Sequence, residues 1–133
     1  MNKFSRTLEL EHQICDLQKD AGNVQVSLKF KQVSLTYARA GRDEARTTYW
    51  HHLTNRNYMR SRAEVVDIKE YAATVHLLTE AKELFSDRSA EVAILEAACK
   101  LFDAKLIDFL EKIEERRSEL NGLGQLLQFP VQP

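Results

Sequence analysis

The sequence predicts an all-α protein: a long antiparallel helical hairpin, or coiled-coil-like helix bundle, whose two arms are either unbroken or split into four helices. Three observations lead to this prediction. Both prolines of the 133-residue chain lie in its last four residues, so no proline stops a helix before Pro130. Apolar residues recur every seven positions through the C-terminal half. The four glycines are too few for the many turns of a β-sandwich or barrel.

An N-terminal arm is expected over residues 3–55, because apolar residues recur there in alternating steps of four and three. Lys31 and Arg42 are polar interruptions of this row, and Gly22 with Asn23 could end a first helix. The members of the row are Leu10, Ile14, Leu17, Ala21, Val24, Leu28, Leu35, Ala38, Ala45 and Tyr49.

Residues 24–37 also alternate between apolar and polar side chains, as a half-buried β-hairpin would. The helix is favoured, because no tight-turn dipeptide separates the two halves of this segment. In addition, Val26, Phe30, Val33 and Tyr37 form a stripe at helical spacing.

A connection is predicted over residues 54–62, where the apolar rhythm lapses and two Asn and three Arg occur. Ser61 and Glu64 fit a capping box that would open the C-terminal arm. The connection would fold the chain back on itself, so that the two arms run antiparallel. The whole chain, residues 1–133, is expected to be a single helical domain.

The C-terminal arm, residues 62–127, carries the strongest pattern in the sequence. Nine apolar residues follow one another at intervals of seven, and a companion row lies three residues further on. Such a seam must be covered by another helix. Its central members are Leu78, Phe85, Val92, Leu95, Cys99, Phe102, Leu106, Phe109, Ile113 and Leu120.

Two alternatives remain within this arm. Residues 86–89 gather helix-capping side chains, so a turn there could create a separate helix over residues 63–85. The inner face of that helix would be Val65, Ile68, Ala72, Val75 and Leu78. Near the C-terminus, the helix could stop at Asn121 or continue to Leu127, before an extended tail over residues 128–133.

A block of arginines and aromatic residues is the first candidate for partner binding. Residues 39–62 hold six arginines against two acidic residues, whereas residues 63–91 hold seven acidic against three basic residues. Arginine and aromatic rings bind bases, phosphates or an anionic membrane, but they are also enriched at protein interfaces. Charge balance within the fold or across a subunit contact is favoured. The candidate residues are Arg39, Arg42, Arg46, Tyr49, Trp50, Arg56, Tyr58 and Arg60.

The apolar C-terminal segment is the second candidate. Leu126, Leu127 and Phe129 could dock into a groove of a partner, or fold back over the end of the bundle.

No pattern in the sequence is typical of catalysis, of a phosphate loop or of a metal site, so no catalytic residue, cofactor or metal is expected. Cys15 and Cys99 sit among apolar neighbours and are expected to be reduced core thiols. Neither a signal peptide nor a transmembrane segment is apparent, which favours the cytoplasm.

The expected function is that of a non-catalytic structural or adaptor protein, a homo-oligomer or a small subunit of a larger complex. The reason is the apolar width of the C-terminal arm, which exceeds what one partner helix can cover. The additional apolar residues are Ile94, Ala97, Leu101, Ile107 and Leu110. Binding of nucleic acid, or of an anionic membrane, through residues 39–62 is the alternative.

Overall fold

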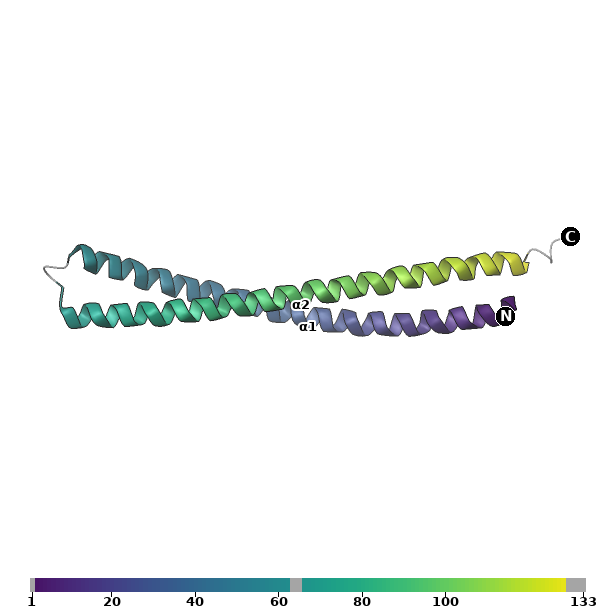
Figure 1. Ribbon diagram of the computed structural model, residues 1–133, viewed down its shortest axis with the longest axis horizontal. Helices are drawn as coiled ribbons and strands as arrows, with labels where there is room; N and C mark the ends of the chain where they lie inside the picture. The colour runs from purple at the N-terminus through teal and green to yellow at the C-terminus, as the bar shows by residue number, and fades with distance from the viewer. Residues whose placement is uncertain (1, 63–65, 129–133) are drawn as a thin grey trace. The chain divides into compact units, whose positions relative to one another are not determined.

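The protein consists of two long α-helices that pack against each other as an antiparallel hairpin. The computed structural model describes residues 2–62 and 66–128, and it describes side chains only as far as residue 124. Figure 1 shows the paths of the two helices. Helix α1 comprises Lys3–Ser61, and helix α2 comprises Ile68–Gln128. No β-strand occurs in the described residues. The predicted fold class is therefore confirmed.

The residue directly before each helix caps its first turn with its side chain. The Asn2 Oδ1 atom accepts a hydrogen bond of 2.8 Å from the Ser5 backbone N–H. In α2, the Asp67 Oδ1 atom accepts one of 3.0 Å from the Lys69 backbone N–H. Each cap satisfies a backbone donor that has no partner within its helix.

Each place where the sequence allowed a break lies inside a continuous helix. Gly22 and Asn23 are helical in α1, and residues 86–89 are helical in α2. No described residue, glycine included, has a positive φ, so no left-handed cap interrupts either arm. Residues 24–37 are helical as well, and α2 continues past Asn121 to Gln128. The arms are thus unbroken, and the β-hairpin alternative is excluded.

The predicted connection over residues 54–62 is wrong, because α1 continues to Ser61. The sequence shows a lapse in the apolar rhythm there, but the same spacing continues through the half-buried Arg56 and Met59. The methylene stem of an arginine can cover apolar surface while its charge stays in water, which explains how Arg56 replaces an apolar residue. The capping box is also wrong, because Asp67 caps α2; Glu64 lies outside the described residues.

The inner face proposed for the start of α2 is also partly wrong. Ile68 is 83% exposed and Ala72 is exposed too, whereas Val75 is half-buried and Leu78 is buried. Val65 lies outside the described residues. Instead, the sevenfold row sets the inward direction, with Thr74 buried between the half-buried Tyr71 and the buried Leu78. The Thr74 hydroxyl donates a 3.0 Å hydrogen bond to the Glu70 carbonyl, which satisfies this polar group within its own helix.

The hairpin divides into two compact units, each built from a segment of both helices. The first unit comprises Met1–Phe30 and Cys99–Pro133, and the second comprises Lys31–Ala98. In the first unit, a buried cluster of Ile14, Ala21 and Ile113 is joined by half-buried Leu17, Leu106, Phe109 and Leu120.

The core of the second unit is made mainly of small and aliphatic side chains. One aromatic pair joins its two helices, because the Tyr49 ring stacks on the Phe85 ring with centroids 6.1 Å apart and planes 6° from parallel. The buried apolar residues of this unit are Leu35, Ala38, Ala45, Leu78, Ala81 and Val92.

Candidate functional site

The seam residues of α2 face α1. Three of the ten, Leu78, Val92 and Ile113, are buried. The remaining seven are half-buried: Phe85, Leu95, Cys99, Phe102, Leu106, Phe109 and Leu120. The seam therefore holds the hairpin together.

Several arginines of the block over residues 39–62 have partners within the chain. The Arg39 Nη2 atom lies 3.2 Å from Glu96 Oε1 on α2, and Arg42 lies 3.4 Å from its neighbour Asp43. Arg56 donates to Asn57 Oδ1 at 3.0 Å and 3.3 Å. These contacts are solvent-exposed and contribute little to stability. The Arg39–Glu96 pair fits the interpretation that this block balances the acidic segment that follows it.

The aromatic members of the block fall into two groups. Tyr49 packs inward against Phe85, so it belongs to the hairpin interior. Trp50 and Tyr58 are exposed, and the Arg62 guanidinium lies 5.3 Å from the centroid of the Tyr58 ring. The sequence row already places Tyr49 on the inward face, and Trp50, the next residue, points about 100° away from it on a helix.

Arg46 and Arg60 are exposed, and no ion pair is found for either within the described ranges, 2–62 and 66–128. Arg46 lies four residues before Trp50, so the two side chains share a face of α1. Arg46 and Trp50 are the part of the block that could contact another molecule.

The C-terminal candidate is only partly described. Leu126 and Leu127 belong to the last turn of α2, where the backbone alone is described, and Phe129 lies outside the described residues.

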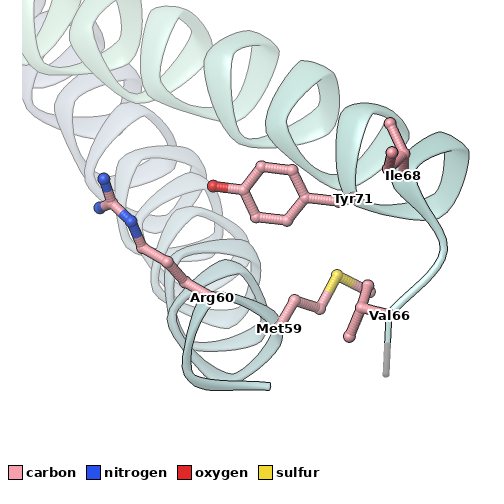
Figure 2. A pocket seen from close by; sticks show the side chains of 5 residues that line it. All are labelled: Met59, Arg60, Val66, Ile68 and Tyr71. Atoms are coloured by element: carbon pink, nitrogen blue, oxygen red, sulfur yellow. The ribbon is translucent and has the colours of Figure 1, made fainter. Parts of the chain in front are cut away.

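A small apolar pocket lies where α1 ends and α2 begins (Figure 2). Its volume is about 250 Å³, and its lining residues are Met59, Arg60, Val66, Ile68 and Tyr71. In Figure 2, Tyr71 extends from α2 toward α1, and the Met59 side chain extends toward Val66.

The titratable and sulfur-containing side chains do not gather into a site. Within residues 2–62 and 66–128, no three His, Cys, Asp or Glu side chains are placed to hold a metal ion. Cys15 is exposed, contrary to the expectation of a core thiol, because it lies one position past the inward-facing Ile14; Cys99 is half-buried, and both thiols are free. Neither helix, as far as it is described, contains an apolar run that could cross a membrane.

One polar contact between the helices was not anticipated from the sequence. In the first unit, the Arg6 guanidinium donates two hydrogen bonds to the Glu119 carboxylate, Nε to Oε1 at 2.9 Å and Nη2 to Oε2 at 3.0 Å. The hydrogen bonds from Arg6 hold the pKa of Glu119 below its ordinary value, and those to Glu119 raise the pKa of Arg6. Bidentate geometry of this kind fixes the register of the two helices as well as their attraction.

This contact predicts a modest dependence of stability on pH. Because the folded pKa of Glu119 lies below the unfolded one, its stabilising effect is present at neutral pH and is lost as pH falls below about 4. Glu119→Gln should therefore lower the melting temperature slightly at pH 7 in low salt, and not at pH 3. Circular dichroism melts at the two pH values measure this. Equal losses at both would show that the charge of Glu119 is irrelevant.

Large apolar side chains on the outward faces of the helices form a feature that the candidate residues above did not include. On α1, one stripe of such side chains includes Val26 and Phe30 in the first unit and Val33 and Tyr37 in the second. The exposed fractions of Phe30 and Tyr37 are 71% and 76%, and that of Ile94 on α2 is 70%. The helical spacing of the α1 residues was visible in the sequence, but only the pairing of the helices shows that this stripe points away from the partner helix.

No family model, no curated protein and no solved structure matches this chain. Its function is therefore inferred from its own side chains.

Proposed function

We propose that this protein is a non-catalytic structural or adaptor protein of a larger assembly, and that it binds protein chains, or itself, through its long helices in a coiled-coil-like manner. The cytoplasm is the proposed compartment.

The observation that supports this proposal is the outward apolar surface of both helices. Side chains as large as Phe30, Tyr37 and Ile94 stand mostly in water, whereas Leu10 is the only large side chain that is fully buried among the described residues. Exposed apolar surface costs free energy in water, and burial against another protein recovers about 25 cal/mol per Å². Aromatic residues in such positions are also the usual anchors of protein interfaces.

Affinity purification of the tagged protein from its native cells tests the proposal. A stoichiometric protein partner is expected, and it should persist after nuclease treatment. Phe30→Gln and Tyr37→Gln should each reduce its recovery at least about tenfold, because truncating an aromatic anchor typically costs 1.4 kcal/mol or more.

Thr36→Gln is the matched control, because Thr36 precedes Tyr37 on the same helix and is also exposed. It should leave recovery unchanged. Recovery that is equal for Tyr37→Gln and Thr36→Gln would contradict a role for the outward apolar face.

Nucleic-acid binding is a second candidate, favoured by the exposed Arg46 and Trp50 on one face of α1. A guanidinium can grip a phosphate while an indole stacks on a base. This function predicts that nuclease removes the captured material and that Arg46→Gln weakens binding to mixed RNA or DNA. Protein partners that survive nuclease, together with unchanged binding in Arg46→Gln, would exclude it.

A further inference from the structure

The pocket between the end of α1 and the start of α2 combines an apolar wall with two polar groups. We call it the connection pocket; it lies within the unit Lys31–Ala98, and its lining residues are Met59, Arg60, Val66, Ile68 and Tyr71. In the view of Figure 2, the Arg60 guanidinium and the Tyr71 hydroxyl lie on one side of the pocket. The apolar side chains of Met59, Val66 and Ile68 lie on the other side. The pocket is therefore amphipathic.

The surroundings of the connection pocket are positively charged. Residues 45–62 of α1 hold four arginines and no acidic residue. Among the described residues from 56 to 71, four are basic and two are acidic, and the carboxylate of Asp67 already caps α2. An anionic group is therefore attracted to this end of α1.

Arg60 is the arginine that this surface offers to a ligand. The Arg62 guanidinium lies 5.3 Å from the centroid of the Tyr58 ring, and the Arg56 guanidinium donates to Asn57. Arg60 is exposed, and neither an ion pair nor a hydrogen bond is found for its guanidinium in the part of the chain that the structure describes. A guanidinium in this state binds a carboxylate through two parallel hydrogen bonds.

The apolar wall of the connection pocket has the size of a site for one side chain. Ile68 is 83% exposed at the start of α2, and Val66 before it is half-buried. The volume of the pocket is about 250 Å³, which lies below the range of about 300–1,000 Å³ that is typical of sites for small molecules. A single large apolar side chain of another protein fits such a space, and anchors seated in pockets are typical of protein interfaces.

We propose that the connection pocket binds a segment of a partner protein in which a large apolar residue lies close to an aspartate or glutamate. The apolar side chain enters the pocket beside Ile68, and the carboxylate pairs with Arg60. The Tyr71 hydroxyl is a second donor on the polar side of the pocket. The inference rests on the proposed function and names the chemistry of the partner at one site.

The combination of an apolar wall and a cation distinguishes this partner from other occupants. Residues 125–133 of the chain itself are rich in apolar residues, but they contain no aspartate or glutamate that could pair with Arg60. Phosphate groups would pair with Arg60 but would leave the side chain of Ile68 in water. A segment with both an apolar and an acidic residue uses both sides of the pocket.

Selection of random linear peptides of about twelve residues, displayed on phage, against the full chain tests the proposal. Wild type should enrich peptides with an acidic residue within about four positions of a leucine, isoleucine, methionine or phenylalanine, since residues this close can share one face. A peptide of this group should bind Arg60→Glu at least about tenfold more weakly, because like charges then face each other. Fluorescence anisotropy of the labelled peptide measures the dissociation constants.

Arg46→Glu is the matched control for the charge. Arg46 is also an exposed arginine of α1 in the same unit, but it does not line the connection pocket. This variant should bind the selected peptide as wild type does.

The apolar wall is tested by a second pair of variants. Ile68→Gln should weaken binding of the selected peptide at least about fivefold, because it removes apolar surface next to the anchor. Ile94→Gln is its control, since Ile94 is a 70% exposed isoleucine of the same helix that does not line the connection pocket. It should leave the affinity unchanged. Circular dichroism should show equal helix content in all four variants and wild type.

The inference would be overturned at the selection step if no peptide were enriched, or if the enriched peptides lacked either the acidic or the apolar residue. It would also be overturned if Arg60→Glu bound the selected peptide no more weakly than Arg46→Glu, because binding would then depend on net charge or lie elsewhere. Equal affinities of Ile68→Gln and Ile94→Gln would exclude the apolar anchor.

The proposed function is tested separately from this site. Capture of a partner protein through Phe30 and Tyr37 depends on neither Arg60 nor Ile68. A failed peptide selection together with a captured partner would therefore reject the connection pocket and keep the proposed function.

Discussion

Replacing Ile113 by aspartate is expected to lower the free energy of unfolding by about 4 kcal/mol. Ile113 is 5% exposed and belongs to the buried cluster with Ile14 and Ala21. The new carboxylate would lie among these apolar side chains with no cation to pair with it in the cluster. Urea unfolding, followed by circular dichroism at a fixed protein concentration, measures the loss.

Ile107→Asp is the matched control, because it makes the same change on the same helix and in the same unit. Ile107 is 55% exposed, so its carboxylate would stay in water and the loss should be within about 0.5 kcal/mol. Similar losses in the two variants would mean that Ile113 does not face α1, and the packing of the seam would be refuted.

Replacing Ser86 by proline is expected to destabilise the protein by about 3 kcal/mol or more. Ser86 lies within α2, where the sequence allowed a turn but the structure is helical. Proline removes the backbone N–H that bonds to the carbonyl of residue 82, and its ring clashes with that carbonyl. The loss can be measured by the same urea unfolding and as a fall in helix content.

Ile68→Pro controls for the introduction of a proline into α2. Ile68 is the first residue of this helix, directly after the cap Asp67, where the missing N–H has no helical partner in any case. This variant should unfold within about 0.5 kcal/mol of wild type. If Ser86→Pro were equally well tolerated, the chain would turn near residue 86 and α2 would not be continuous.

The sequence determined the class of fold because hydrophobic periodicity is a local signal. The row from Leu10 to Tyr49 faces inward as predicted, and every member of it is buried or half-buried. The sevenfold row of α2 crosses residues 86–89 without a slip, and the helix does the same. In both cases, the spacing of apolar residues outweighed residue types that are typical of caps.

The position of the connection could not be read from the sequence, because it depends on packing between the arms. Arg56 reads as a turn residue, yet its stem continues the inward row and α1 extends to Ser61. Asp67 caps α2 in place of Ser61, because Ser61 still belongs to α1.

The sequence by itself determined that the chain forms long amphipathic helices and which stripe of each is apolar. Only the tertiary structure decided which apolar and charged residues remain available to a partner. Tyr49 and Trp50 are neighbours of similar chemistry, but Phe85 of α2 stacks on Tyr49, whereas Trp50 remains 56% exposed. Helix period is local, whereas exposure depends on which face the other helix covers.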